Sequence, residues 1–431
     1  MGRSSAPFIY GDSHMKILFL HQNFPGQFKH LAPALVKMGH EVCALSLTDR
    51  QVPNVRFEKY HLKRASSQNI FPLANDFETK LIRGEACAQG LINLRNSGFV
   101  PDIVIAHPGW GETLFLKDIF PKAKQLHFLE FYYNNTGGDV GFDPEFINQK
   151  PEDAFRVTVK NAHVLMALND MDRAYSPTQW QKSRYPESYH AKIDVIFDGI
   201  DTSIVKPAIP GEKVQVQLKN ARGIQSTLTP NDQVVTFINR NLEPYRGYHS
   251  FMRALPLILE QNPNAKILIV GGDGTSYGAK PPAGKTWKGI FLDEMKDRLD
   301  FSRIFFLGNL AYEHYLQVLK LSQCHVYLTY PFVLSWSCLE AMSAGCVVVG
   351  SNTPPVAEVI EHGHNGLLVD FFDAKALAEQ VTQVLTSPDD FAQMRKNARQ
   401  TIVDRYDLQT VCLPQQLALV DAMLKEAKEM A

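Results

Sequence analysis

Residues 15–46 read MKILFLHQNFPGQFKHLAPALVKMGHEVCALS, and this stretch decides the fold class of the first half of the chain. Its opening apolar run suits a buried parallel strand. A turn-rich loop follows, and residues 30–38 then carry apolar side chains at helical spacing until Gly39. Residues 41–46 are a second apolar run. Strand, loop, helix and strand in this order predict a βαβ unit.

The same alternation continues along the chain. In the first half, further strands are predicted at residues 102–106, 124–128, 164–168 and 192–197. In the second half, strands are predicted at 233–238, 265–270, 303–307, 325–329 and 347–350, and helices at 249–262, 290–299, 312–322 and 338–344. Two consecutive runs of this kind predict an α/β fold with two doubly wound, Rossmann-like domains.

The domain boundaries follow from where this alternation stops and restarts. Residues 201–231 lose the strand pattern and carry three prolines, so we expect a linker between a first domain at 15–200 and a second at 232–405. Residues 1–14 read as a leader fused by cloning. Residues 406–431 are expected to be a C-terminal helix, and the sequence leaves open whether it crosses back to the first domain. The carboxyl ends of both sheets would face each other across a cleft, where such sheets bind ligands.

The composition excludes several other classes of protein. The 431 residues include 44 Lys and Arg against 45 Asp and Glu, so no strong positive field favours nucleic acid as a partner. The six cysteines form no Cys-x-x-Cys pair and are expected to be buried reduced thiols. No apolar stretch approaches the roughly 20 residues of a membrane-spanning helix.

Two glycine-containing loops follow predicted strands. Gly26 permits close backbone approach, and the helix after it offers N–H groups to a phosphate, although a plain turn explains this loop equally well. Gly272 and Asp273 lie in a second loop, GGDG at 271–274, which either contacts a base or ribose or is a tight turn. Neither loop has the Gly-x-Gly-x-x-Gly spacing of a dinucleotide site.

A third stretch, NRNLEPYRG at residues 239–247, follows a buried strand. Arg240 and Arg246 can converge there on one diphosphate through bidentate hydrogen bonds, and an arginine stays charged without a proton to lose. The alternative is two solvated surface arginines. The position directly after a strand favours the phosphate site.

A fourth stretch, PFVLSWSCLEAM at residues 331–342, lies between a predicted strand and a helix that begins near Ser337. Ser335 and Ser337 are residue types that cap helices, bind a phosphate at a helix N-terminus, or do both. Glu340 lies in the first turn, where the helix dipole alone would favour it. A carboxylate there can also accept both hydroxyls of a ribose.

These stretches together resemble the retaining glycosyltransferases of family 4, which have the GT-B fold. The resemblance covers nearly everything from Met15 onward and includes residues 195–201 and 351–369. It implies that Arg240 and Arg246 grip the donor diphosphate, with Asn241 as an alternative to Arg240 because the spacing is one residue longer than usual. It also implies that Glu340 binds the donor ribose. Phe332 stands where the family has a glutamate that touches the sugar, with Leu334 and Trp336 in the same donor-binding loop.

The resemblance also directs attention to two residues at strand ends in the first half. His107 ends one predicted strand and Glu130 ends the next, where the family often has a histidine near the reacting sugar. A carboxylate at that place can orient an acceptor hydroxyl or stabilise positive charge on the anomeric carbon. Each residue can instead be a polar strand end that holds a loop.

We therefore expect retaining, metal-independent transfer of a hexose from a nucleoside-diphosphate sugar, with a UDP-sugar favoured and a GDP-sugar next. The first domain would hold the acceptor, which is a glycan, a lipid-linked or a small-molecule hydroxyl. No cofactor or metal is expected, and the arginines would take the place of a metal ion. We expect a cytoplasmic location, and contact with the inner face of the membrane stays open, as does the oligomeric state. A sugar-nucleotide 2-epimerase and a non-catalytic sugar-nucleotide-binding protein are the alternatives.

Overall fold

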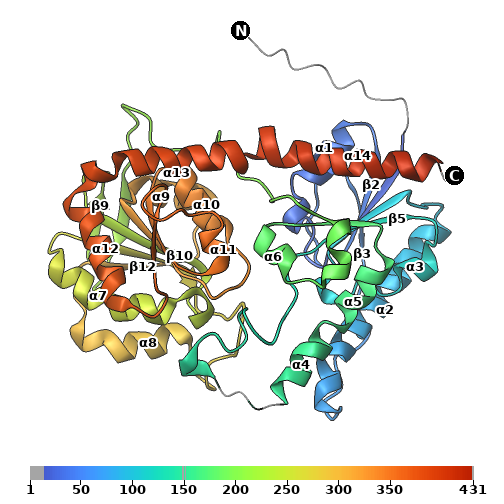
Figure 1. Cartoon of the computed structure of the whole chain (residues 1–431), viewed down its shortest axis with the longest axis horizontal. Coiled ribbons are helices and arrows are strands. Elements are labelled where there is room, and N and C mark those ends of the chain that lie inside the picture. Colours follow the sequence, from blue (N-terminus) through green and yellow to red (C-terminus); the bar gives the residue numbers. More distant parts are fainter. Residues whose placement is uncertain (1–13, 148–149, 151, 430–431) are drawn as a thin grey trace, which may run out of the picture. The chain divides into compact units, whose positions relative to one another are not determined.

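A computed structural model describes residues 14–147, 150 and 152–429, which form two compact units. Unit 1 comprises residues up to 135, residues 148–198 and residues from 413 onward. Unit 2 comprises residues 136–147 and 199–412. Each unit is built around its own parallel sheet with helices on both faces (Figure 1). Residues 1–13 of the expected leader lie outside the described part of the chain.

Unit 1 contains a seven-stranded parallel sheet in the order β3-β2-β1-β4-β5-β6-β7. The strands are β1 Lys16–Leu20, β2 Glu41–Ser46, β3 Arg56–Lys59, β4 Ile103–Ala106, β5 Lys124–Phe128, β6 Arg173–Ser176 and β7 Ile193–Val195. The helices are α1 Leu31–Lys37, α2 Asn75–Asn96, α3 Leu116–Ile119, α4 Asp153–Lys160, α5 Ala162–Asp170, α6 Gln179–Ser183 and α14 Leu413–Glu429. Alternate residues of β1 point to opposite faces of the sheet. Ile17 and Phe19 belong to one hydrophobic core cluster, and Leu18 and Leu20 belong to another. Both faces of the sheet are therefore covered.

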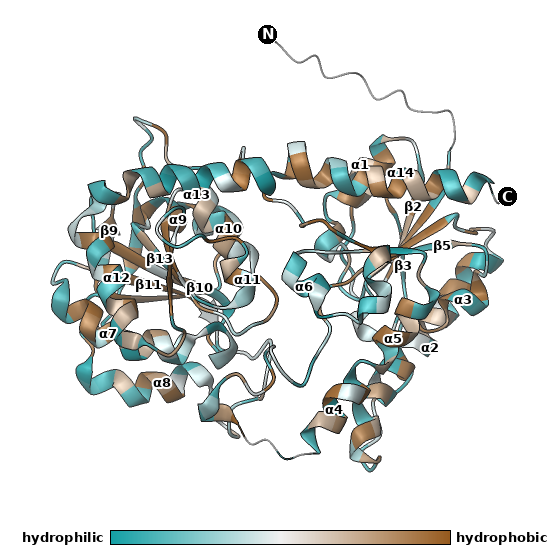
Figure 2. Cartoon of the chain, viewed as in Figure 1, coloured by the Kyte–Doolittle hydropathy of each residue, from teal (hydrophilic) through white to brown (hydrophobic). Residues whose placement is uncertain are grey.

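Unit 2 contains a six-stranded parallel sheet in the order β12-β11-β10-β13-β14-β15 and a separate hairpin, β8-β9. The strands are β8 Val216–Lys219, β9 Gln225–Leu228, β10 Val234–Asn241, β11 Lys266–Gly272, β12 Ile304–Gly308, β13 Cys324–Tyr327, β14 Val347–Ser351 and β15 Leu367–Val369. The helices are α7 Tyr248–Gln261, α8 Trp287–Met295, α9 Tyr312–Leu321, α10 Trp336–Ser343, α11 Pro354–Ala357, α12 Ala374–Thr386 and α13 Ala392–Arg405. Figure 2 shows apolar strands at the centre of each unit and polar residues on the outer helix surfaces.

The last helix, α14, returns to the first unit although it follows the whole of the second in sequence. Its buried side chains Leu419, Val420 and Met423 belong to the same core cluster as Ile17 and Phe19 of β1. It lies beside α1 in Figure 1. The predicted C-terminal helix is interrupted at its start, because residues 408–412 form a π-helical turn before α14 begins. Residues 430–431 lie outside the described residues.

The structure differs from the sequence prediction at residues 164–168, which were predicted to be a strand and lie within α5. The buried residues of α5 are at positions 163, 164, 167 and 168, which is helical spacing. A short apolar run does not distinguish a buried strand from a buried helix segment, and this explains the wrong prediction.

Two segments are grouped differently in the structure than the domain boundaries predicted from the sequence would group them. Residues 136–147, inside the expected first domain, pack with unit 2. Residues 201–231, the expected linker, also belong to unit 2 and carry the β8-β9 hairpin. This hairpin is attached to β12 by hydrogen bonds from Ala221 N–H to Ile304 O (2.8 Å) and from Asn220 Nδ2 to Ser302 O (2.8 Å).

Candidate functional site

Arg246 lies at the carboxyl edge of the sheet in unit 2, in a short turn (Pro244–Arg246) after β10. Its side chain is buried, with 6% of the residue exposed. The Nη1 group donates to Thr329 Oγ1 at 2.8 Å and to the Val333 carbonyl at 2.9 Å. No carboxylate among the described residues forms an ion pair with this guanidinium. The buried carboxylate of Glu243 favours the charged guanidinium electrostatically but forms no ion pair with it. A hydrogen-bonded anion is therefore missing among the described residues, and this indicates an anion site, because a buried charge is costly unless it is paired.

Gly247 fixes the direction in which the chain leaves this turn. Its φ is 69°, in the left-handed region that favours glycine. A Cβ at this position would lie 2.3 Å from Leu328 Cβ, so there is no room for a side chain. The tight turn between β10 and α7 therefore places Arg246 against the end of β13.

Phe332 is buried next to Arg246, with 3% of the residue exposed. Its ring centroid lies 5.4 Å from that of Tyr245 and 4.9 Å from that of Tyr277. The Arg246 guanidinium lies 5.9 Å from the Phe332 ring and 5.1 Å from the Tyr277 ring. Where the resemblance expects a glutamate, this chain therefore has an aromatic wall beside the cation.

Helix α10 begins directly after this wall. Ser335 is its N-cap, and its hydroxyl oxygen accepts a hydrogen bond from Ser337 N–H at 3.3 Å. Ser335 N–H in turn donates to Tyr327 Oη at 2.8 Å, and Arg246 Nη1 lies 3.4 Å from the same oxygen. Leu334 is buried before the cap, and Trp336 is the first helical residue. Arg246 and the start of α10 thus share Tyr327 as a common partner.

Glu340 is buried in α10, and each of its carboxylate oxygens accepts one tyrosine hydroxyl. Tyr312 Oη lies 2.7 Å from Oε1, and Tyr315 Oη lies 2.7 Å from Oε2. Burial, and next the negative charge of Glu340, raise the pKa values of both tyrosines, so both hydroxyls keep their protons and donate. The sequence analysis missed the two tyrosines. Their spacing of three residues on one helix face is the only signal they carry.

The predicted loop residues form a second group at the same edge of the sheet. Asn241 pairs in register with Gly272, and a Cβ on Gly272 would lie 2.7 Å from Asn241 Oδ1. Asn241 Nδ2 donates to Ser276 Oγ at 2.7 Å. Asp273 forms an ion pair of 3.1 Å with Lys288. Arg240 is exposed and forms no hydrogen bond or ion pair with the described residues, so the structure brings Asn241, rather than Arg240, into this group.

Glu243 links the two groups and was missed by the sequence analysis. Its buried carboxylate accepts hydrogen bonds from the backbone N–H groups of Ser276 (3.1 Å) and Tyr277 (3.0 Å). Burial raises the pKa of Glu243, although these N–H groups oppose that effect. The result is that the glycine-rich loop after β11 is held with Tyr277 over Arg246.

In unit 1, the loop after β1 places His21 beside Gln27. Asn23 N–H donates to His21 Nδ1 at 2.9 Å, so the ring proton is on Nε2, which lies 2.8 Å from Gln27 Oε1. Burial, and next the neighbouring His107, lower the pKa of His21 to about 3, so the ring is neutral at neutral pH. Gly26 has a φ of 47°, and a Cβ there would lie 2.5 Å from the His21 ring. This loop needs glycine in order to pack on His21.

Glu130 lies directly after β5, and its carboxylate contacts two side chains, one at each oxygen. Gln27 Nε2 donates to its Oε1 at 3.1 Å, and His107 Nε2 lies 3.5 Å from its Oε2. Gly109 N–H donates to His107 Nδ1 at 3.1 Å, so the His107 proton is on the nitrogen that faces the carboxylate. The Glu130 side chain is 32% exposed and that of His107 only 4%. The structure therefore brings Gly26, His107 and Glu130 together around a carboxylate that can reach solvent.

The sequence contains one Asp-x-Asp, Asp170-Met171-Asp172, whose paired carboxylates bear on the prediction of metal independence. Asp172 accepts hydrogen bonds from Lys124 Nζ (3.1 Å) and from Gln125 N–H (2.8 Å), at the amino end of β5. Glu130 follows the opposite end of the same strand. This Asp-x-Asp is therefore at the wrong edge of the sheet to join the site residues of unit 1.

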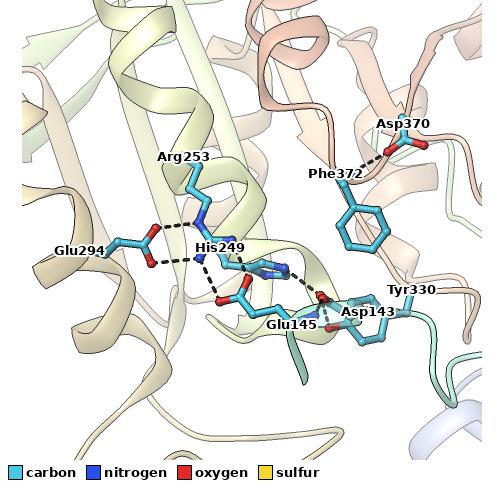
Figure 3. Close-up of polar contacts among 8 residues, drawn as sticks. All are labelled: Asp143, Glu145, His249, Arg253, Glu294, Tyr330, Asp370 and Phe372. Atoms are coloured by element: carbon cyan, nitrogen blue, oxygen red, sulfur yellow. Dashed lines mark hydrogen bonds and ion pairs between the residues drawn. The ribbon is translucent and has the colours of Figure 1, made fainter. Parts of the chain in front are cut away.

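Asp143, Glu145 and His249 form a group whose spacing would allow them to hold a metal ion, with ligand atoms within 4.8 Å of one another. Protein contacts account for this group, however (Figure 3). Glu145 forms a bidentate pair with Arg253 at 2.6 and 2.9 Å, which leaves a positive charge beside the group. His249 Nε2 lies 2.9 Å from Asp143 Oδ2. We interpret the group as the attachment of residues 143–145 to α7, and metal independence stays a prediction.

Two family models match most of the chain. Residues 38–205 match the glycosyl transferase family 4 group, and residues 221–401 match glycosyl transferases group 1. Among curated proteins, the spore coat protein SA of Bacillus subtilis is 24% identical over 245 residues, 53% of this chain and 58% of that protein. D-inositol 3-phosphate glycosyltransferase of Corynebacterium urealyticum is 25% identical over 56% of this chain and 53% of that enzyme. The chain thus spans about half the length of the curated relatives it matches.

Solved structures resemble nearly the whole chain, with 95–96% of it covered. Sucrose-phosphate synthase of Thermosynechococcus elongatus has a TM-score of 0.69 and 16% identity, with 96% of this chain and 100% of that one covered. The Anabaena protein HepE in complex with UDP-glucose has a TM-score of 0.64 and 18% identity, with 95% and 100% covered. These likenesses confirm the predicted fold class. Among the described helices, none has the length and apolar character needed to span a membrane.

Proposed function

We propose, from the premise that this chain belongs to the glycosyl transferases of group 1, that it transfers a hexose from a nucleoside-diphosphate sugar to a hydroxyl acceptor. The observation that carries the proposal is Arg246, a buried guanidinium at the carboxyl edge of the unit 2 sheet that forms no ion pair with any carboxylate of the described residues. A diphosphate supplies the missing negative charge, and arginine binds it through two parallel hydrogen bonds.

The other donor contacts follow from the position of Arg246. Ser335 and Ser337 lie at the start of α10, where the helix dipole favours an anion. Their backbone N–H groups donate to Tyr327 Oη and Ser335 Oγ in this structure, so they bind a phosphate only by exchanging these acceptors. Asn241 assists the diphosphate, and Arg240 does so only if its exposed side chain turns toward the ligand. Glu340 accepts the ribose hydroxyls. Each of its oxygens has a second lone pair, so the bonds from Tyr312 and Tyr315 do not prevent this.

We assign the remaining donor contacts to the residues around Phe332. Its ring, with Leu334 and Trp336, would pack against the apolar face of the sugar or base. Gly272 and Asp273 would line the nucleoside end of the site. A UDP-sugar is favoured because one structural neighbour, HepE, was solved in complex with UDP-glucose. A GDP-sugar is the next choice.

We assign Glu130 and His107 to the acceptor and the reacting sugar. A carboxylate that accepts from Gln27 and faces the His107 N–H can orient an acceptor hydroxyl, or stabilise the positive charge that develops on the anomeric carbon. The acceptor then attacks the same face that the diphosphate leaves, and the configuration is retained. Gly26 allows the loop that positions Gln27. We expect the reaction to proceed in the cytoplasm, on a glycan, lipid-linked or small-molecule acceptor.

A donor screen followed by a transfer assay tests the proposal. Thermal-shift measurements with UDP- and GDP-hexoses identify the donor, because a ligand at 100 times its Kd adds about 2.7 kcal/mol of stability. Release of nucleoside diphosphate is then measured with and without candidate acceptors, in excess EDTA, and the anomeric configuration of the product is read by NMR.

The outcomes separate the alternatives. Acceptor-dependent release in EDTA with a retained anomeric centre supports the proposal. Conversion of the donor into its C2 epimer, without acceptor-dependent release of nucleoside diphosphate, favours the 2-epimerase. Donor binding without turnover, unaffected by Arg246→Ala, favours a non-catalytic binding protein. Loss of turnover in EDTA with rescue by magnesium or manganese contradicts metal independence.

A further inference from the structure

A segment of the chain from the first half, residues 136–147, packs on unit 2 beside the proposed donor site. We call this segment the strap. It lies in the connection from Phe128, the end of β5, to Asp153, the start of α4. Connections between strands and helices in α/β units usually have 2–6 residues, and much longer ones are commonly functional or disordered. The strap, residues 136–147, is a described part of such a long connection and packs on unit 2, and this raises the question of what it does.

The strap buries two carboxylates, and each of them accepts a tyrosine hydroxyl of unit 2. Asp139 and Asp143 each have 4% of the residue exposed. Tyr245 Oη donates to Asp139 Oδ2, and Tyr330 Oη donates to Asp143 Oδ2 at 2.6 Å. Burying a carboxylate is costly unless it is hydrogen-bonded. The strap is therefore held on the rest of unit 2 by hydrogen bonds to two specific tyrosines and not by apolar contacts alone.

Apolar and charged contacts fix the strap between and beyond these two bonds. The Phe142 ring packs on Tyr330, Phe371 and Phe372, with centroids 5.1–5.3 Å apart. Beyond Asp143, Glu145 pairs with Arg253, which also pairs with Glu294 at 2.6 Å (Figure 3).

Of the two tyrosines that the strap holds, Tyr245 belongs to the aromatic wall beside Arg246, and Tyr330 packs on Tyr245. Tyr245 is the residue before Arg246 in the same turn, and its carbonyl accepts a hydrogen bond from Tyr330 N–H at 3.0 Å. The Tyr245 ring lies 4.7 Å from that of Tyr330 and 5.4 Å from that of Phe332. A change in the rotamer of Tyr245 would therefore disturb the turn that carries the guanidinium and the aromatic ring beside it.

We propose that the strap is a positioning element of the donor site, in which Asp139 fixes Tyr245 and thereby sets the place of Arg246 and Phe332. This inference rests on the proposed function, because it assumes that Arg246 binds a nucleoside diphosphate. Asp139 touches no reacting atom and acts only through Tyr245. The chain that leads from Glu130, the proposed acceptor carboxylate, thus continues directly into the segment that orders the donor residues.

The test is the affinity of the full-length protein for UDP and for GDP, measured by titration calorimetry. Asp139→Ala and Tyr245→Phe each remove one partner of the bond, and each should weaken the binding of the preferred nucleotide about tenfold. The double variant should bind like either single variant, because both changes remove the same interaction. Asp139→Asn keeps an acceptor oxygen and should restore most of the affinity.

The matched control is Tyr60→Phe, which removes a buried tyrosine–carboxylate bond of 2.7 Å to Glu112 in unit 1. It should leave nucleotide affinity within about twofold of the wild type, because this bond lies within unit 1 and includes none of the residues assigned to the donor. Circular dichroism checks that each variant is folded. If Asp139→Ala does not fold, Tyr245→Phe and Asp139→Asn carry the comparison.

The outcomes keep this inference separate from the proposed function. If the wild type binds neither nucleotide, the proposed function fails and the inference fails with it. If the wild type binds and Tyr245→Phe binds equally well, the donor site stands and the role of the strap is wrong. Equal losses in Tyr245→Phe and Tyr60→Phe would show a general loss of stability and would also overturn the inference.

Discussion

At the scale of single residues, we expect substitution of Arg246 to have the largest effect on turnover. Arg246→Ala should lower turnover about 10²–10³-fold, the usual effect of removing one preorganised charge-stabilising donor. Arg246→Lys should retain part of the activity, because the charge remains while the planar fork is lost. Rates are measured as release of nucleoside diphosphate with saturating acceptor. A near-normal rate for Arg246→Ala would remove the residue from the mechanism.

Phe332 is the residue at which this chain departs most clearly from the family pattern. Its ring cannot accept a hydrogen bond, and an unpaired sugar hydroxyl buried against it would cost about 1–3 kcal/mol. We therefore predict a donor sugar without a polar group there, such as a deoxy sugar, or backbone acceptors in its place. Phe332→Glu should then shift preference toward fully hydroxylated hexoses. The introduced carboxylate would lie near Arg246, whose guanidinium is 5.9 Å from the ring.

The measurement for Phe332 is kcat/KM for two donors, one hydroxylated and one deoxy, in both proteins. Because the ratio of the two values is compared, a general loss of activity in the variant cancels. An unchanged ratio would show that Phe332 does not face the sugar.

At the scale of elements, the strap predicts a change of stability with pH. Burial of Asp143 raises its pKa, but hydrogen bonds from His249 and Tyr330 outweigh burial and hold the pKa below its usual value. A carboxyl with a lowered folded-state pKa stabilises the fold above its unfolded pKa, about 3.9, and this contribution is lost as the pH falls through the folded value. The difference in unfolding free energy between wild type and Asp143→Asn should therefore be constant near pH 6.

Below about pH 4 the same difference should shrink, since the carboxyl of Asp143 takes up a proton first in the unfolded wild type and, at still lower pH, in the folded wild type as well. Urea denaturation at several pH values measures it, and subtraction of the variant removes the effect of all other carboxyls. A difference that is the same at pH 6 and pH 3 would show that ionised Asp143 does not stabilise the strap.

The elements also show what the sequence could and could not predict. Strands such as β1 and β10 were predictable because their apolar runs stand between clear turn signals, and the start of α10 because Ser335 is a typical N-cap. Helix α5 was mistaken for a strand, since a short apolar run fits both. The strap could not be predicted, because its partners Tyr245 and Tyr330 lie about a hundred and about two hundred residues away. A local sequence pattern gives no information about hydrogen bonds between residues so far apart in the sequence.

At the scale of the whole molecule, sequence order and unit membership differ in two places. The strap belongs to unit 2 although it lies between two stretches of unit 1 in the sequence. Helix α14 belongs to unit 1 although it follows the last residue of unit 2. Val420 and Met423 of α14 are fully buried in the core cluster that contains β1. Apart from Gly26, the residues predicted to bind the donor lie within unit 2, where local motifs mark them, whereas the extent of each unit depends on contacts between residues far apart in the sequence.

Two separate cores predict two cooperative unfolding transitions in differential scanning calorimetry, because two-state behaviour holds for single domains. Met423→Ala removes a fully buried side chain of unit 1 and should lower only one transition, at a cost of about 2–5 kcal/mol. Leu255→Ala does the same in α7 of unit 2 and should lower only the other. The donor nucleotide at about 100 times its Kd should raise the transition that Leu255→Ala lowers, by about 2.7 kcal/mol. If the nucleotide instead raises the transition that Met423→Ala lowers, the donor site is in unit 1 and the assignment of Arg246 is wrong.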